Sequence, residues 1–190
     1  FKKLDNENFP GKGKILFTGS SSIRFCDSLE KDMEPLEVLN RGFGGAQISH
    51  VIYHFEEIIK PYDPKAIVFF CGTNDLTALK TPEETVHDFQ KFLSLIRKEF
   101  GNIKVYMIGI KPSVERFYLD EEEKIFNNSI KLLASEDAYL EYIDVWDSML
   151  SEDGSRMPEL YVEDGLHMNK KGYEVWTKLV RKSLLKDFNI

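Results

Sequence analysis

A run of serines near the start of the chain and an aspartate–histidine pair near its end could together supply a nucleophile and its base. Residues 19–22 read Gly-Ser-Ser-Ser and follow an apolar run, and residues 164–167 read Asp-Gly-Leu-His. A serine nucleophile needs a base to accept its proton, and that base needs a group that orients it. Because Asp164 comes three residues before His167, its carboxylate can hold one ring nitrogen and leave the other for a serine. This pair is half of a Ser-His-Asp triad.

Each of these motifs also has an ordinary structural interpretation. Serine is a preferred N-cap residue, so residues 19–22 could simply start a helix. Residues 74–75 (Asn-Asp) could form an Asx turn, and residues 164–165 (Asp-Gly) are a common turn signal. A functional site is favoured because a nucleophile, glycine and amide donors, and a base with its orienting group occur together in one chain.

The elements that must position these residues follow from the hydrophobic pattern. Short apolar runs alternate with longer amphipathic segments, which is typical of a parallel sheet with helices on both faces. We predict strands at residues 14–18, 36–39, 66–71, 104–110 and 140–145, and helices at 22–33, 47–59, 82–100, 121–134 and 171–185. The 190 residues are predicted to form one α/β domain, a three-layer α/β/α sandwich around a five-stranded, mainly parallel sheet, with residues 1–13 as an exposed lead-in.

Three of the polar motifs come directly after predicted strands. Residues 19–22, 40–45 (Asn-Arg-Gly-Phe-Gly-Gly) and 72–75 (Gly-Thr-Asn-Asp) follow the first, second and third strands. In an open parallel α/β sheet, ligands bind beyond the carboxyl ends of the strands, so a functional site belongs here. Glycine lets other atoms approach the backbone closely, and a helix N-terminus adds positive potential. These loops are therefore suited to stabilise a developing oxyanion.

Taken in order along almost the whole chain, four blocks resemble the SGNH hydrolase family, which includes the GDSL-type esterases and lipases. The blocks are residues 17–23 (Phe-Thr-Gly-Ser-Ser-Ser-Ile), 40–45, 72–75 and 164–167. The resemblance implies a flavodoxin-like fold in which Ser21 is the nucleophile, His167 the base and Asp164 the residue that orients the base. It further implies an oxyanion hole formed by the backbone N–H groups of Ser21 and Gly45 and by the Asn74 side chain. It implies neither a metal nor another cofactor.

The first block departs from the family pattern. The usual Gly-Asp-Ser is Gly-Ser-Ser here, so Ser20 stands where the family has an aspartate, and the loop lacks that carboxylate. The run of three serines leaves Ser20 and Ser22 as alternative nucleophiles to Ser21. The Gly-x-Ser-x-Gly elbow of the α/β-hydrolases is absent, because Ile23 occupies the position of its second glycine.

The implied reaction is acyl transfer from a small-molecule or carbohydrate ester to water. The loops after the strands are short and the chain has no inserted lid, which favours a shallow cleft and a small acyl group. The loops resemble those of family members that deacetylate sugars, so we expect a carbohydrate O-acetylesterase or a related short-chain esterase. The alternatives are a lysophospholipase- or thioesterase-like acylhydrolase and a catalytically silent binding protein of the same fold. Lys111 and Arg116, after the fourth predicted strand, could line the alcohol side of the cleft.

The composition argues against other classes of partner. A net charge of −7 with interspersed charges disfavours nucleic acid and anionic membranes, and no apolar stretch approaches the roughly 20 residues of a membrane span. Nucleotide-binding glycine motifs are absent, and His50 and His54 lack the intervening glutamate of a zinc protease motif. Cys26 and Cys71 lie beside apolar runs and are predicted to be buried rather than disulfide-bonded. Because the chain does not begin with Met, we expect it outside the cytoplasm if a signal peptide was removed upstream, and in the cytoplasm otherwise.

Overall fold

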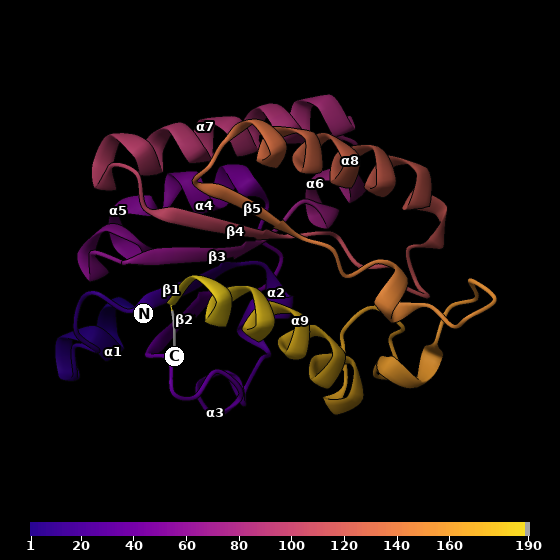
Figure 1. Ribbon diagram of the computed structural model, residues 1–190, viewed down its shortest axis with the longest axis horizontal. Helices are drawn as coiled ribbons and strands as arrows, with labels where there is room; N and C mark the ends of the chain where they lie inside the picture. The colour runs from indigo at the N-terminus through magenta and orange to yellow at the C-terminus, as the bar shows by residue number, and fades with distance from the viewer. Residues whose placement is uncertain (189–190) are drawn as a thin grey trace.

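The computed structural model describes residues 1–188, and within this range five parallel strands form one sheet (Figure 1). The strands are β1 (Ile15–Gly19), β2 (Val38–Gly42), β3 (Ala66–Phe70), β4 (Lys104–Ile108) and β5 (Leu140–Ile143). Their order across the sheet is β2-β1-β3-β4-β5, and every neighbouring pair is parallel. Gly19 is level with Gly42 on one side and with Phe70 on the other, so β1, β2 and β3 end side by side.

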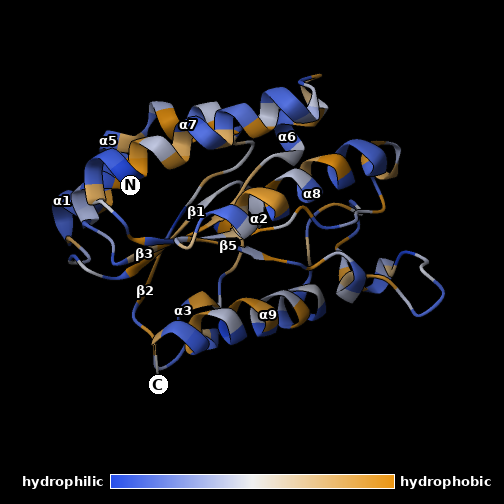
Figure 2. Cartoon of the chain, turned by 45° about the horizontal axis from the view of Figure 1, so that its top comes forward, coloured by the Kyte–Doolittle hydropathy of each residue, from blue (hydrophilic) through white to orange (hydrophobic). Residues whose placement is uncertain are grey.

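Helices cover both faces of the sheet, which confirms the predicted α/β/α sandwich (Figure 1). One face carries α4 (Ile48–Tyr53), α5 (Phe55–Ile58), α7 (Pro82–Phe100) and α8 (Asp120–Glu136). The other face carries α2 (Ser21–Arg24), α3 (Leu29–Asp32) and α9 (Lys170–Phe188), and the short α6 (Thr73–Thr77) follows β3. Figure 2 shows hydrophilic and hydrophobic residues alternating along α7, α8 and α9, as expected for helices with one face on a core. Within residues 1–188, no helix combines the length and the apolar character needed to cross a membrane.

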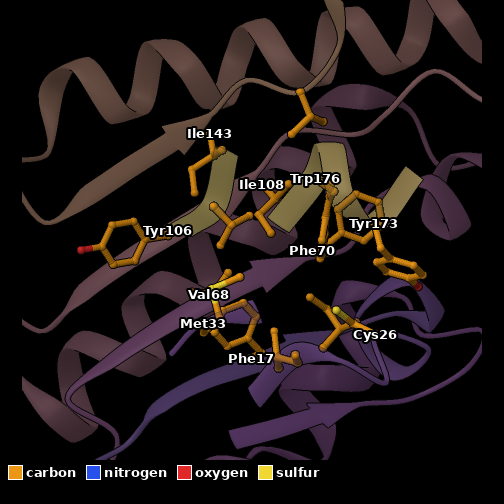
Figure 3. Packing of buried hydrophobic residues seen from close by; sticks show 14 of the residues in the cluster. Phe17, Cys26, Met33, Val68, Phe70, Tyr106, Ile108, Ile143, Tyr173 and Trp176 are labelled. Atoms are coloured by element: carbon orange, nitrogen blue, oxygen red, sulfur yellow. The ribbon is translucent and has the colours of Figure 1, made fainter. Parts of the chain in front are cut away.

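The sheet separates two hydrophobic cores. On the side of α9, Val68 of β3 belongs to a cluster of buried hydrophobic residues that includes Phe17 and Trp176 (Figure 3). On the opposite side, Phe69 of β3 stacks on Phe92 of α7 with ring centroids 4.3 Å apart. Successive side chains of a strand point to opposite faces, so a central strand such as β3 supplies apolar residues to both cores.

Strand β2 is longer at its carboxyl end than the sequence indicates. Polar residues from Asn40 onward mark the predicted end at residue 39, but the structure continues the strand to Gly42. Arg41 is satisfied in place, because Nη2 donates to Asp5 at 2.7 Å and Nε donates to the Tyr62 hydroxyl at 2.8 Å. An edge strand allows such contacts, since one of its sides has no neighbouring strand.

Two predicted helices, at residues 22–33 and 47–59, are interrupted. The first forms α2 and α3, which residues 25–28 separate. The Ser28 hydroxyl, just before α3, donates to the Asp32 carboxylate at the end of that helix at 2.6 Å. The second forms α4 and α5, which meet at His54, where ψ is 8° instead of a helical value. The predicted helices at the positions of α7, α8 and α9 are confirmed within a few residues.

Residues 1–13 are largely exposed and contain α1 (Lys2–Glu7), a helix that the sequence analysis does not predict. Asp5 anchors this segment, because its carboxylate pairs with Arg41 at 2.7 Å and accepts the Tyr62 hydroxyl. Phe9 stacks on the Tyr62 ring with centroids 5.7 Å apart. The N-terminal segment is therefore fastened to the edge of the sheet by specific contacts.

Candidate active site

Ser21 begins α2, directly after β1. Gly19 has φ +126°, and a Cβ at this position would lie 2.0 Å from the carbonyl oxygen of Phe70, so only glycine fits. The N–H of Ser20 donates to the same carbonyl at 2.9 Å and holds the turn against β3. Ser20 and Ser22 are buried and Ser21 is partly exposed, so Ser21 is the most accessible of the three serines.

The side chains of Ser21, His167 and Asp164 form a continuous chain of polar contacts. Ser21 Oγ lies 3.0 Å from His167 Nε2, and His167 Nδ1 lies 2.5 Å from Asp164 Oδ2. With Asp164 ionised, Nδ1 carries the ring proton and donates it, so Nε2 is free to accept the proton of Ser21. Within residues 1–188, the His167 ring makes no hydrogen bond to Ser20 or Ser22. The arrangement can activate a serine hydroxyl for attack on a carbonyl carbon.

Hydrogen bonds keep the Asp164 carboxyl ionised. Its Oδ1 accepts the backbone N–H groups of Leu166 and His167, each at 2.8 Å, while Oδ2 faces the His167 ring. Partial burial favours the neutral acid, but these hydrogen bonds outweigh it and lower the pKa of Asp164 to about 2. Gly165, with φ +64°, makes the tight turn that aims both N–H groups at one carboxylate.

The loop after β2 is fastened to the loop after β3. Asn74 Nδ2 donates to the carbonyl oxygen of Ala46 at 3.0 Å. The buried Asp75 carboxylate accepts the N–H of Ile48 through both of its oxygens, at 3.1 and 3.3 Å. These contacts fix the position of Asn74 relative to the glycine loop at residues 42–45, which directly precedes Ala46.

The three donors expected for an oxyanion hole occur in these loops. Within residues 1–188, the backbone N–H groups of Ser21 and Gly45 have no protein acceptor, and Asn74 Nδ2 uses one of its two hydrogens on Ala46. Asn74 lines the same narrow cleft as Ser21 and His167. Gly45 is exposed one residue before Ala46 and does not itself line that cleft.

Lys111 and Arg116 both line the cleft that contains Ser21. Lys111 is only 4% exposed, and its ammonium donates to the carbonyl of Leu166 at 2.7 Å, so it is bound to the turn that carries His167. Burial lowers the pKa of Lys111 to about 8. Arg116 is partly exposed, and its Nη1 donates to Asn74 Oδ1 at 3.0 Å.

A buried carboxyl group, Glu123 in α8, lies next to Thr73, which lines the same cleft. It is not among the site residues predicted from the sequence. Its side chain is completely buried, Oε1 accepts the Thr73 hydroxyl at 3.2 Å, and Oε2 has no partner within residues 1–188. Burial raises the pKa of Glu123 to about 8. The sequence shows it as one of four consecutive acidic residues, 120–123, and only its helical spacing from Phe126 marks it as inward-facing.

An exposed aromatic ring, Phe25, also contacts the site. Its ring meets the His167 ring edge-on, with centroids 5.2 Å apart, and 44% of the residue is exposed. Phe25 lies within the helix predicted at residues 22–33, whereas the structure ends α2 at Arg24 and leaves Phe25 at the rim of the cleft.

The two histidines with metal-like spacing serve local structure. His50 Nδ1 accepts the N–H of Gln47 and completes a capping box at the start of α4. His54 Nδ1 lies 3.6 Å from Glu57 Oε2. Over the described part of the chain, no three His, Cys, Asp or Glu side chains gather as metal ligands would.

Comparisons with known proteins match nearly the whole chain. The model of the GDSL-like Lipase/Acylhydrolase family matches residues 17–175. N-acylneuraminate cytidylyltransferase of Escherichia coli O18:K1:H7 is 27% identical over 171 residues, 88% of this chain, but the chain spans only 39% of that protein. Platelet-activating factor acetylhydrolase IB subunit alpha1 of Rattus norvegicus is 23% identical over 179 residues, which cover 91% of this chain and 75% of the relative.

Solved structures share the fold. A Streptococcus pneumonia protein that is described as a platelet activating factor has a TM-score of 0.82 at 23% identity, over 98% of this chain and 88% of its own. The acetyl xylan esterase AlAXEase has a TM-score of 0.73 at 18% identity, over 90% of this chain and 98% of its own. The family match extends from β1 into α9 and includes both the serine loop and the aspartate–histidine turn. The chain therefore belongs to the GDSL-like lipase/acylhydrolase family and is a carboxylic ester hydrolase.

Proposed function

We propose that this chain is a serine esterase that removes small acyl groups, chiefly acetyl, from a carbohydrate alcohol. The observation that carries the proposal is the unbroken contact chain from Ser21 Oγ to His167 Nε2 at 3.0 Å and from His167 Nδ1 to Asp164 at 2.5 Å. A capping serine needs no contact with a histidine, and a turn aspartate needs none with its ring. The three side chains together match the requirements of nucleophile, base and orienting acid.

In the proposed reaction, His167 Nε2 accepts the Ser21 proton while Oγ bonds to the ester carbonyl carbon. The negative charge that forms on the carbonyl oxygen is stabilised by the N–H groups of Ser21 and Gly45 and by Asn74 Nδ2. The tetrahedral species then collapses, the alcohol leaves with the proton from His167, and the acyl group stays on Ser21. Water repeats the sequence and releases the acid. Asp164, ionised at any pH near neutrality, stabilises the imidazolium that forms in each half.

The size of the cleft supports a short acyl group. The space over Ser21 is about 20 Å³, enough for about one water molecule, so a long chain would find no tunnel there. The names of two similar proteins point the same way: one is an acetylhydrolase and the other an acetyl xylan esterase.

The surface next to His167 supports a sugar as the alcohol. Phe25 leads from the cleft into a groove of about 400 Å³, whose lining includes Asp27, Ser28, Asp32 and Glu174. An aromatic face can stack on the C–H groups of a sugar ring, and carboxylates and hydroxyls can bond its hydroxyl groups. The groove is therefore suited to the alcohol part of an acetylated sugar.

An acyl-chain series tests the reaction. With p-nitrophenyl acetate, butyrate and octanoate, kcat/KM should fall steeply as the acyl chain lengthens, and Ser21→Ala should abolish turnover of all three. A fluorophosphonate probe should label Ser21, because only an activated serine attacks such phosphorus centres quickly. A preference for octanoate would support the lysophospholipase- or thioesterase-like alternative, and absence of an adduct would support a silent binding protein.

Acetylated xylan oligosaccharides test the alcohol. Phe25→Ala should raise KM for these substrates more than it raises KM for ethyl acetate, since ethanol is too small to reach the groove. Phe117→Ala removes an aromatic residue that is 63% exposed and serves as the matched control. Equal activity of Phe25→Ala and the parent on acetylated oligosaccharides would contradict the assignment of the groove.

A further inference from the structure

One contact in the cleft has no place in the reaction described so far: Arg116 Nη1 donates to Asn74 Oδ1 at 3.0 Å. We propose that Arg116 is a positioning residue of the oxyanion hole, which fixes the Asn74 carboxamide in its productive orientation and polarises its N–H groups. The inference rests on the proposed function, because it takes Asn74 as a donor to the oxyanion.

The Asn74 carboxamide has two orientations, and the neighbouring groups allow only one. In the observed one, Oδ1 faces the Arg116 guanidinium and Nδ2 faces the carbonyl of Ala46 at 3.0 Å. A flip would set the amide oxygen against that carbonyl and the amide hydrogens against the guanidinium, which are two repulsive pairings. Only the observed orientation leaves the second hydrogen of Nδ2 for a substrate oxyanion. Without Arg116, one neutral hydrogen bond alone would resist the flip.

The charge of Arg116 is not neutralised by an ion pair. Across residues 1–188, no carboxylate oxygen lies within 4.0 Å of its guanidinium. The buried carboxyl of Glu123 lies close enough to feel this charge, but burial raises its pKa to about 8 and keeps it largely protonated at neutral pH. A guanidinium bound to the amide oxygen draws electron density from the amide and strengthens its N–H donors.

Arg116 is itself held by the loop after β4. Its backbone N–H donates to the Ser113 hydroxyl at 3.2 Å, and Ser113 is only 2% exposed. The N–H groups of Val114 and Glu115 both donate to the carbonyl of Gly165, at 2.9 and 3.1 Å. One short loop therefore contacts the turn that carries the base and also supplies the cation that orients Asn74.

Neutral and anionic acetyl esters separate this assignment from direct binding of substrate by Arg116. With neutral p-nitrophenyl acetate, Arg116→Met should lower kcat by about tenfold to fiftyfold and leave KM within about twofold, because the lost effect acts on charge in the transition state. The kcat of Arg116→Lys should lie between those of Arg116→Met and the parent, since an ammonium can also donate to the Asn74 amide oxygen but lacks the planar guanidinium. Millimolar guanidinium should partly restore kcat to Arg116→Ala.

A double-mutant cycle distinguishes positioning from general support of the fold. In the Asn74→Ala background, Arg116→Met should cost less than about twofold in kcat, because the amide through which it acts is gone. An undiminished loss in that background would overturn the inference, as would an unchanged kcat in Arg116→Met alone. An effect confined to KM for anionic 4-acetoxybenzoate would overturn it in favour of an anion subsite.

Two further variants separate the failure of this inference from the failure of the proposed function. Arg97 is a second partly buried arginine, which bonds Ile103 and Asp137, and Arg97→Met should leave kcat unchanged. If Ser21→Ala retained turnover, the proposed function would fail. If Ser21→Ala abolished turnover while Arg116→Met kept the parental kcat and melting temperature, only the role of Arg116 would fail.

Discussion

Replacing Asp164 by asparagine tests the contact chain at the residue that holds His167, the proposed base. The amide oxygen of asparagine can still accept the N–H groups of Leu166 and His167, so the turn should persist. Its NH₂ group, however, would face His167 Nδ1 and donate to it. The ring proton would then move to Nε2, which could no longer accept the Ser21 proton.

The expected loss follows from the charges involved. An imidazolium and a carboxylate about 4 Å apart interact by about 4 kcal/mol at an effective dielectric constant of 20. The Asp164 side chain is 46% exposed, so solvent screening reduces this to about 2 kcal/mol. Moving the ring proton back to Nδ1, so that Nε2 can accept the Ser21 proton, breaks the hydrogen bond between the asparagine NH₂ group and Nδ1, which costs about 1 kcal/mol more. The sum of about 3 kcal/mol corresponds to a kcat about 10²-fold lower in Asp164→Asn.

The assay is kcat for p-nitrophenyl acetate between pH 5 and pH 8, with the melting temperature measured in parallel. The pKa of Asp164 is about 2 in the folded protein, below its value in the unfolded chain. Ionised Asp164 therefore stabilises the fold fully above about pH 4, and this stabilisation is lost as the pH falls toward 2. It is constant across the pH range of the assay. Asp153→Asn is the matched control, because hydrogen bonds from Ser151 and Ser155 also lower the pKa of Asp153 to about 2, with no histidine involved. Retention of more than half of the parental kcat in Asp164→Asn would reduce this residue to a turn former.

Four other predictions concern single positions. Ser21→Ala should abolish both turnover and labelling by a fluorophosphonate, and peptide mapping of an adduct to another serine would contradict the assignment. Asn74→Ala should lower kcat by about 10² to 10³ with little change in KM; a near-normal kcat would make Asn74 a turn residue. Gly19→Ala should prevent stable folding, measured as loss of the cooperative thermal transition, because its Cβ would lie 2.0 Å from a backbone oxygen at φ +126°. Glu123→Gln should raise the melting temperature more at pH 8 than at pH 5. Burial raises the pKa of Glu123 to about 8, so above about pH 4.3 the carboxyl ionises more readily in the unfolded chain than in the fold, which increasingly favours unfolding. Equal increases in melting temperature at both pH values would contradict this prediction.

The fold could be predicted from the sequence where local pattern decides the structure. The apolar run at β3 is buried on both faces. Thr81 is the N-cap of α7, and its capping box with Glu84 and the proline at position 82 mark the start of the helix. The end of β2 could not be predicted in this way. Arg41 is tolerated there because of Asp5, 36 positions earlier, and no local pattern reports such a partner.

The candidate site shows the same division between local and long-range information. Asp164 and His167 meet within one turn, so their spacing alone indicates the contact. Arg116 and Asn74 lie 42 positions apart, and the sequence indicates only that both come after strands. The burial of Glu123 depends on how α8 packs, which composition cannot reveal in a run of four acidic residues.

The sequence does not indicate where the turn that carries His167 lies relative to the sheet, because no strand leads into this turn. The chain reaches it from β5 through an irregular segment with two short 3₁₀ turns, at Asp147–Met149 and Pro158–Leu160. The loop after β4 compensates: its backbone N–H groups bond the Gly165 carbonyl, and the Lys111 ammonium bonds the Leu166 carbonyl at 2.7 Å. Because Lys111 is buried, this contact is shielded from water and hydrogen-bonded to a fixed acceptor. A loop that carries none of the four motifs therefore helps to fix the position of His167, the proposed base, relative to Ser21.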